Sequence, residues 1–177
     1  MLHPSNLNDI VVDIELVAET SSVLIYYDNP NNWLYVDWYG DLTMASVQES
    51  CLVTAQYFLT RKCTRILNDN TNVTGVTPDV GMWLSNQYVP HMQLAGVEYM
   101  AWVLSSNFNT QCITDIALHN LSSPVVALFN DIASAYSWLC AVRFKAPTLA
   151  APPAKGVYRN QEELRNHVTA LSTLYMH

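Results

Sequence analysis

The sequence predicts one α/β domain with a mixed, mostly parallel sheet of four to five strands and about four helices, followed by a C-terminal tail helix. Two observations carry this prediction. Strand-like residues dominate up to Gly40, where the apolar spacing changes to the three-to-four interval of an amphipathic helix. Beyond that point short apolar runs and amphipathic stretches alternate, which is typical of parallel strands joined by helices. We expect the helices on one face of the sheet or split across two.

The first elements are strands. Residues 10–16 alternate weakly and form either an edge strand or the lead-in to the next one. Residues 23–27 and 33–39 flank turn residues at 28–32, which predicts an antiparallel hairpin. Alternation sends one subset of the hairpin's aromatic residues into the core and exposes the other, which could face a partner or an apolar ligand. The aromatic residues are Tyr26, Tyr27, Trp33, Tyr35, Trp38 and Tyr39.

A helix, a strand and a second helix follow. Residues 43–62 have the spacing of one buried helical face, and residues 65–68 read as a short strand. The second helix covers residues 79–94. Its start is indicated by a capping residue, a proline whose φ angle matches the first helical turn, and an acidic side chain near the positive end of the helix dipole. Gly96 is placed to end this helix. The start signals are Thr77, Pro78 and Asp79.

A strand, a short helix, a last strand and a closing helix complete the predicted domain. In this order they are residues 97–104, 110–120, 124–129 and 132–142, with Asn130 or Asp131 capping the closing helix. Apolar residues of the two helices are expected to face inward. They are Ile113, Ile116 and Ala117, then Ile132, Ala135, Leu139 and Val142. We expect the core to include Trp38, Ile66, Trp102 and Val126.

Three regions result from this pattern. The predicted domain covers residues 10–143, and residues 144–159 are an Ala/Pro-rich linker by composition. Residues 160–177 form an amphipathic tail helix that docks on this domain or on another subunit, because an isolated helix of this length is marginal in water. Its apolar stripe consists of Leu164, Val168, Leu171 and Tyr175.

Composition argues against several classes of function. The formal net charge is −7 and the eight Lys and Arg residues are scattered, so binding to nucleic acid or to an anionic membrane is not expected. No apolar run has the length of a membrane span, and the first residues do not resemble a signal peptide. The four cysteines lack metal-ligand spacing and are interpreted as reduced, apolar residues. The chain is therefore interpreted as cytoplasmic.

Catalytic and metal-binding motifs are not found. The five histidines have no metal-ligand spacing, and the sequence contains no HExxH, GxSxG, Walker or GxGxxG motif. We therefore predict no catalytic residue, no metal and no cofactor, and a protein that is not an enzyme.

A polar stretch after the strand at 65–68 is the predicted site. In an α/β sheet, a loop that leaves the carboxyl end of a strand and leads to a helix is the usual place for ligands and partners. Three roles stay open: a tight turn held by side-chain bonds to the backbone, a binding loop, or a phosphorylated switch at Thr71 or Thr74. The predicted ligand- or partner-binding loop consists of Asn68, Asp69, Asn70, Thr71, Asn72 and Thr74.

Residues from about 15 to 142 resemble a STAS-type domain, the SpoIIAA-like fold of bacterial anti-sigma factor antagonists. More closely, they are similar to uncharacterised bacterial proteins grouped with STAS and CRAL-TRIO lipid-transfer domains. The resemblance rests on residues 31–38 (NNWLYVDW), residues 66–75 (ILNDNTNVTG), and Phe129-Asn130-Asp131 with Trp138-Leu139.

The resemblance implies a switch in which a partner kinase phosphorylates a serine in an Asp-Ser-Ser-Gly type loop. Asp69 matches the aspartate of that loop, but Asn70 stands at the position of the phosphoacceptor and Gly75 comes several residues late.

Two functions are therefore carried forward. The preferred one is a non-enzymatic regulatory or protein-interaction module, a homodimer with a protein partner at the loop after Leu67. The alternative is that the same domain binds a small apolar or lipid-like ligand.

Overall fold

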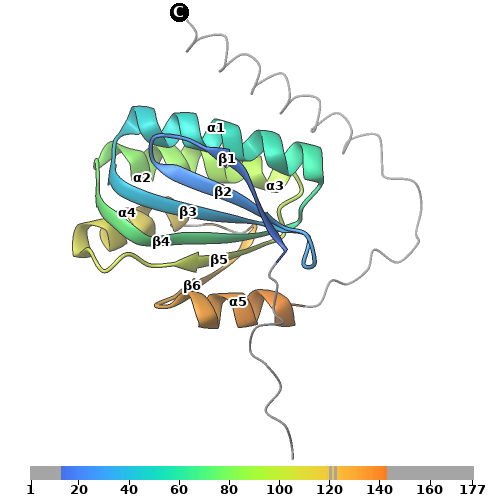
Figure 1. The fold of residues 1–177 in the computed structure, drawn as a ribbon. Coiled ribbons are helices and arrows are strands. Elements are labelled where there is room, and N and C mark those ends of the chain that lie inside the picture. Colours follow the sequence, from blue (N-terminus) through green and yellow to red (C-terminus); the bar gives the residue numbers. More distant parts are fainter. Residues whose placement is uncertain (1–12, 120, 122, 143–177) are drawn as a thin grey trace, which may run out of the picture.

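The computed structural model describes residues 13–119, 121 and 123–142, which form a six-stranded sheet with helices on both faces (Figure 1). The strands lie in chain order across the sheet. β1 pairs with β2 and β2 with β3 in antiparallel fashion, and the remaining neighbours pair in parallel. The bounds are β1 Ile14–Glu19, β2 Val23–Asp28, β3 Trp33–Leu42, β4 Arg65–Val76, β5 Tyr99–Val103 and β6 Val125–Phe129.

The predicted fold class, a mixed and mostly parallel α/β sheet, is confirmed, but the sheet has six strands rather than four to five. The additional strand is β1, which lies at Ile14–Glu19, somewhat later than the weakly alternating residues 10–16. It pairs with β2 from Ile14 opposite Asp28 to Glu19 opposite Leu24. An irregularity between Leu16 and Ala18 interrupts this register.

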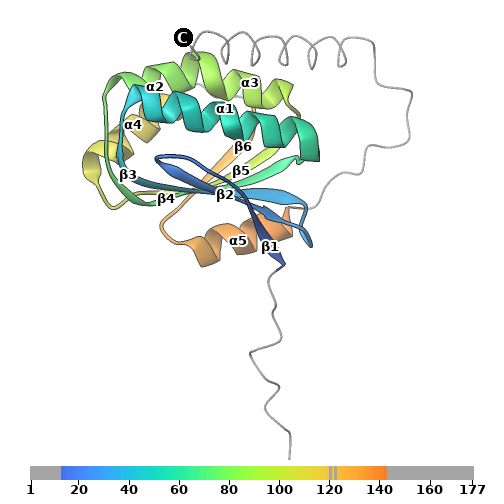
Figure 2. The ribbon, with the colours of Figure 1, turned by 45° about the horizontal axis from the view of Figure 1, so that its top comes forward.

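Helices cover both faces of the sheet (Figure 2). One face carries α1, a continuous helical segment formed by α2, η1 and α3, and α4, whereas α5 packs on the opposite face. Of the two predicted arrangements, helices on one face of the sheet or on both, the structure has the second. The bounds are α1 Met44–Arg61, α2 Asp79–Trp83, η1 Leu84–Tyr88, α3 Val89–Leu94, α4 Phe108–Leu118 and α5 Ile132–Ala141.

Helix ends follow local chemistry. Thr43 caps α1 in a reciprocal capping box with Ser46, and Asp131 rather than Asn130 caps α5 by accepting from the Ser134 backbone N–H at 2.8 Å. Gly96 has the positive φ of +93° expected after a helix. The expectation that Thr77 caps α2 is wrong, because Pro78 already has helical dihedral angles and makes no side-chain cap bond.

The second helix contains a π-helical turn, η1, that the sequence pattern did not predict. Pro90 is the second residue of α3, two residues after η1 ends at Tyr88. A proline within a helix has no N–H to donate to the carbonyl four residues earlier, and its ring clashes with that carbonyl. Widening the preceding turn relieves this conflict, so η1 is the local response to Pro90.

The core consists of two layers, one on each side of the sheet. The larger lies under α1, the α2–α3 segment and α4 and contains Trp38, Ile66 and Trp102, with Val126 packed against it, as expected. The smaller lies under α5 and contains Trp33, Leu67, Ala101, Val103, Ala135 and Leu139.

Two residues expected to face inward are exposed: Ile116 on α4 and Ile132 on α5. The prediction for Ala117 is confirmed, and the buried stripe of α4 consists of this residue with Thr110 and Thr114. A Cβ atom on Gly81 would lie 3.0 Å from the carbonyl oxygen of Ile113, so the glycine permits the close contact of α2 with α4 that sets this orientation.

The predicted loop at residues 68–74 is not a loop. β4 runs without interruption from Arg65 to Val76, because the polar stretch continues to pair with β3 as far as Leu42 opposite Val76. The register shifts twice, between Asp37 and Tyr39 and between Gly40 and Asp41. Polar residues are tolerated here because alternation divides them between the two faces of the sheet.

The predicted linker at 144–159 and the tail helix at 160–177 lie outside the described residues, as do residues 10–12 and 143 of the predicted domain.

Candidate functional site

The six residues of the predicted site lie on β4 and separate into an inner and an outer group. Asn68 and Asn70 face the helices of the larger core layer, where both line an internal cavity. Asp69 and Thr71 face the other side of the sheet, and Asn72 and Thr74 are exposed beyond them. The structure therefore brings the six together along one strand without placing them in one site.

The cavity has a volume of about 50 Å³ and lies between the sheet and the helices of the larger core layer. Strands β3, β4 and β5 form its floor, and residues of α1, the α2–α3 segment and α4 form its walls. Most of its lining is apolar, for example Val47, Val80, Leu84 and Met92. The volume suits a compact molecule and is far below the several hundred Å³ that a lipid-like ligand requires.

Two asparagines and two tryptophans supply the polar groups on the cavity floor. The Nε1–H of Trp38 donates to Oδ1 of Asn68 at 2.9 Å, and Nδ2 of Asn70 donates to the carbonyl of Val103 at 3.0 Å. The first bond fixes the orientation of the Asn68 amide, so that its Nδ2 points away from Trp38. Neither Nδ2 of Asn68 nor Nε1 of Trp102 has an acceptor among the described residues.

These two donors are neighbours. Asn68 on β4 is the register partner of Trp102 on β5, so both side chains leave the sheet on the same face and side by side. Asn68 is 6% exposed and Trp102 is 8% exposed. The cavity therefore has two adjacent buried N–H groups on an otherwise apolar floor.

The outer group centres on the Asp69 carboxylate, which is 1% exposed. It accepts from the Tyr35 hydroxyl at 3.1 Å, from the Thr71 backbone N–H at 2.9 Å and from the Thr71 hydroxyl at 2.6 Å. Burial, with the nearby Asp69, raises the pKa of Tyr35 well above its usual range. Asp69 thus holds the tyrosine and Thr71 in place.

A second carboxylate lies beside Asp69. Asp37 is its register partner on β3 and accepts from Nδ2 of Asn72 at 3.4 Å. Burial and the neighbouring Asp69 raise the pKa of Asp37, whereas the bond from Asn72 partly opposes that shift.

Thr71 is exposed, but it lies within β4, well before α2 begins at Asp79. A phosphate on Thr71 would therefore lie beside two carboxylates and would not benefit from the N-terminus of α2.

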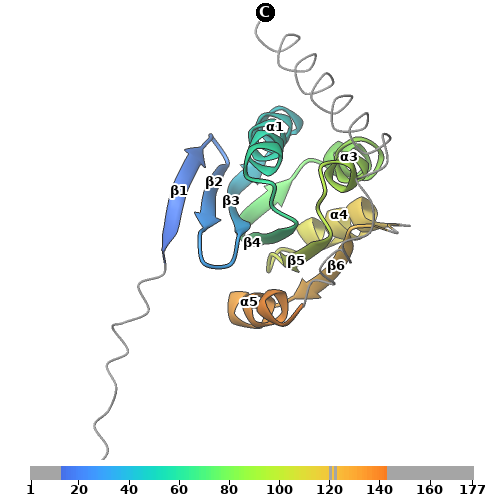
Figure 3. The same ribbon diagram turned by 90° about the vertical axis from the view of Figure 1, so that its right-hand side faces the viewer.

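On the outer side of the sheet, α5 packs under β4, β5 and β6 and also contacts β3 at Trp33, through Tyr136 (Figure 3). Among the described residues no helix covers β1, β2 or the rest of β3 on that side. Tyr26 and Tyr35 stack there with ring centroids 5.5 Å apart, and Leu16, the partner of Tyr26 on β1, is 51% exposed. We call this surface the open face; it consists of Leu16, Tyr26, Tyr35, Asp37 and Thr71.

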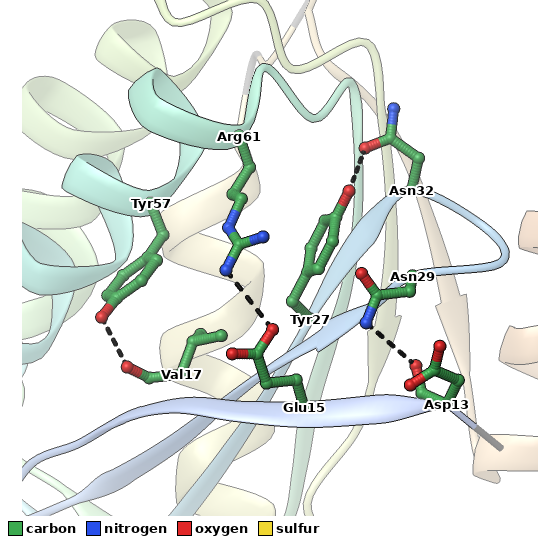
Figure 4. Close-up of polar contacts among 8 residues, drawn as sticks. All are labelled: Asp13, Glu15, Val17, Tyr27, Asn29, Asn32, Tyr57 and Arg61. Carbon is green, nitrogen blue, oxygen red and sulfur yellow. Dashed lines mark hydrogen bonds and ion pairs between the residues drawn. The ribbon is translucent and has the colours of Figure 1, made fainter.

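Contacts on the helix side hold β1 in place and leave its outer side free (Figure 4). The Tyr57 hydroxyl on α1 donates to the Val17 carbonyl at 2.5 Å, and Arg61 pairs with Glu15 at 3.4 Å. The Arg61 guanidinium also lies 4.6 Å from the centroid of the Tyr27 ring. The edge strand is thus tied to α1, which makes the open face a defined surface.

Among the described residues no group of three or more His, Cys, Asp or Glu side chains could hold a metal ion, and no helix is long and apolar enough to cross a membrane. All four cysteines are free thiols, with Cys51 and Cys63 buried and Cys112 and Cys140 exposed.

Three residues of these sites are not predicted as site residues from the sequence. The sequence pattern predicts Tyr35, Trp38 and Trp102 only as hairpin or core aromatic residues. Their partners were polar residues inside an apolar strand, namely Asn68 and Asp69. A buried polar residue needs a hydrogen-bond partner, and on a central strand that partner often lies on a neighbouring strand. The polar residues within the apolar strand therefore indicated that partners on a neighbouring strand should be sought.

No family model and no curated protein matches the sequence. Among solved structures, the chain is similar to an uncharacterised protein of the DUF3478 family from Shewanella loihica PV-4, described as having a SpoIIAA-like fold. The alignment covers 78% of this chain and 99% of that protein, with 19% sequence identity and a TM-score of 0.41. That description names the fold type implied by the resemblance to STAS domains, and the likeness concerns the fold alone.

Proposed function

We propose that the protein is a non-enzymatic interaction module of the STAS-like type, whose binding surface is the open face and whose ligand is an amphipathic helix. One observation carries the proposal. α5 covers one half of the outer side of the sheet, and the other half is an aromatic and acidic surface that no helix among the described residues covers. The chain itself contains a segment of suitable chemistry at residues 160–177, and this segment is the proposed occupant.

Apolar contact would supply the first part of the binding energy. The stacked rings of Tyr26 and Tyr35 and the exposed side chain of Leu16 occupy paired positions on β1, β2 and β3 and form a contiguous patch. α5 already uses Ala135 and Leu139 to bury the adjacent half of the sheet. A second helix beside α5 would complete that layer, as in other sheets with both faces covered.

Charge would supply the second part. Residues 13–142 contain twelve Asp and Glu but three Lys and Arg, whereas residues 143–177 contain five Lys and Arg but two Glu. On the open face Asp37 lies beside the buried Asp69. Arg61 bonds to Glu15 on the helix side, and Arg65 bonds to the Leu139 carbonyl in α5. Four of the five basic residues (Arg143, Lys145, Lys155 and Arg159) precede residue 160, so the electrostatic attraction would act on the residues that connect α5 to the proposed helix.

The geometry of the chain permits this docking. α5 ends at Ala141, and residues 143–159 could span up to about 56 Å when extended. A helix over residues 160–175 would be about 24 Å long. Its apolar stripe (Leu164, Val168, Leu171 and Tyr175) would face the tyrosines. Exchange of this segment between two copies would produce the homodimer predicted from the sequence.

The test uses the full chain and paired variants. Val168→Asp with Leu171→Asp places charges on the apolar stripe, and Asn166→Asp with Thr173→Asp places the same charges off it. We expect the first pair to lower the melting temperature and to make residues 144–177 sensitive to limited proteolysis, whereas the second pair leaves both unchanged. Light scattering on the parent then tells docking within one chain from exchange between two.

A second arm tests the open face itself. Leu16→Asp places a charge on the exposed apolar side chain of the face and should reproduce the effect of the stripe variants, whereas Met82→Asp at an exposed position of α2 should not. If both stripe substitutions leave the melting temperature, the mass and the proteolysis pattern unchanged, the proposal is wrong.

A further inference from the structure

We infer that the internal cavity is a binding site for a compact, uncharged molecule that has an apolar body and one hydrogen-bond acceptor. The inference is independent of the proposed function, because the cavity and the open face lie on opposite sides of the sheet. It rests on the two adjacent N–H groups of Asn68 and Trp102 and on the chemistry of the walls around them.

The two donors specify an acceptor. A buried N–H without a partner is costly, and natural cores rarely keep one, let alone two at neighbouring register positions. Oδ1 of Asn68 already accepts from Trp38, so this amide presents its N–H hydrogens to the cavity. The Trp102 indole can act only as a donor. An oxygen placed between them, such as that of a ketone, an ester or an amide, would receive both bonds.

The walls specify the remainder of the ligand. No charged side chain lines the cavity, so a carboxylate, phosphate or ammonium group would be buried there without an opposite charge. Val47, Val80 and Met92 present hydrocarbon instead. The volume of about 50 Å³ holds several water molecules or a molecule of a few heavy atoms. A small cyclic or branched carbonyl compound fits these limits.

The π-helical turn places two residues in the wall of the cavity. Leu84 and Tyr88, the first and last residues of η1, both line it. The Tyr88 hydroxyl and the Cys51 thiol on α1 hydrogen-bond with each other, which joins the turn to α1. Irregular turns of this kind are frequent at functional sites. The helical wall at η1 is therefore the part of the cavity whose backbone departs from regular geometry.

The experiment uses the full chain labelled with ¹⁵N and a matched pair of probes. Acetone has a small apolar body and one carbonyl oxygen, whereas 2-methylpropene has nearly the same shape without the acceptor. Both are titrated while the Trp102 indole N–H and the Asn68 side-chain amide signals are followed by NMR. We expect saturable downfield shifts of both N–H signals with acetone, and binding at least five-fold weaker for the hydrocarbon.

Two pairs of variants locate the site. Trp102→Phe removes one donor and keeps an aromatic ring, whereas Trp138→Phe makes the same change on α5, on the other side of the sheet. Ile113→Phe fills the cavity from α4, whereas Ile116→Phe adds the same ring at an exposed position of that helix. We expect Trp102→Phe and Ile113→Phe each to weaken acetone binding at least five-fold and the two controls to leave it unchanged.

Three results would overturn the inference. The first is the absence of saturable shifts, which would mean that the cavity holds water only. The second is equal affinity for ketone and hydrocarbon, which would mean that the donors do not select the ligand. The third is unchanged binding after Ile113→Phe, which remains informative even if Trp102→Phe does not fold.

Discussion

The guanidinium of Arg65 lies 4.7 Å from the centroid of the Trp33 ring and joins three elements that are distant in the sequence. Its Nη1 donates at 3.0 Å to the Leu139 carbonyl in the last turn of α5, and its Nη2 donates to the Asn31 carbonyl in the turn before β3. Arg65 is 8% exposed, so these bonds form largely out of water. One side chain at the start of β4 therefore positions both α5 and the β2–β3 turn.

Replacing Arg65 should destabilise the protein strongly. Arg65→Met keeps the aliphatic stem but removes both donors, and we expect the free energy of unfolding to fall by about 2–3 kcal/mol in urea titrations. Arg65→Lys should recover less than half of this loss, because a single ammonium cannot replace the planar fork. Arg61→Met is the control, since its exposed ion pair with Glu15 should contribute less than about 1 kcal/mol. Equal losses for Arg65→Met and Arg61→Met would contradict the assigned role.

The bond between Trp38 and Asn68 should show strong coupling. Asn68→Leu leaves the buried indole N–H of Trp38 without an acceptor, which should cost about 1–3 kcal/mol. Trp38→Phe leaves Oδ1 of Asn68 unpaired at a similar cost. In the double variant no polar atom of this pair remains, so its loss should be smaller than the sum of the single losses. Urea titration of the four proteins of this cycle measures the coupling, and strictly additive losses would argue against the bond.

The carboxylate pair on the open face should make stability depend on pH. The folded-state pKa of Asp37 lies above its ordinary value of 3.8, so the folded protein holds a proton that the unfolded chain has released. The free energy of unfolding should therefore fall as pH rises through the window between these two pKa values. Above that window Asp37 is ionised in both states, and the full destabilisation by its charge is present. Asp37→Asn keeps the acceptor for Asn72 without the charge.

We accordingly expect Asp37→Asn to raise the melting temperature by about 1–3 °C at pH 7 and to have no such effect near pH 3.5. Thermal unfolding at both pH values measures the difference, with Asp115→Asn on the exposed face of α4 as the control. A gain of equal size at the two pH values would show that charge on Asp37 is not its cause.

Local sequence patterns predict most of the helices and strands, whereas features that depend on pairing between distant strands are not predicted. The change of hydrophobic period at Gly40 and the helix cap at Asp131 depend only on neighbouring residues, and the sequence predicts both. The continuation of β4 through Asn68, Asp69 and Asn70 depends on β3 opposite it, and for this reason the local sequence alone predicts a loop at residues 68–74. The cavity could not be predicted, because it requires the register that places Asn68 beside Trp102.

The four cysteines should separate into two classes of reactivity. Burial raises the pKa of the Cys63 thiol to about 11 and that of Cys51 further, so neither is ionised to a useful extent at pH 8. Cys112 and Cys140 are exposed. With an aromatic disulfide reagent at pH 8 we expect two thiols to react promptly, and all four to react once the protein is unfolded in denaturant.

Two serine variants assign these classes. Cys112→Ser should remove one of the prompt thiols, whereas Cys51→Ser should leave the prompt amplitude unchanged and remove one of the thiols that appear only on unfolding. Because Cys51 lines the cavity and bonds to Tyr88 on η1, its protection also reports on the packing of that wall. Three or more prompt thiols in the folded parent would mean that α1 and η1 separate far more readily than their contacts imply.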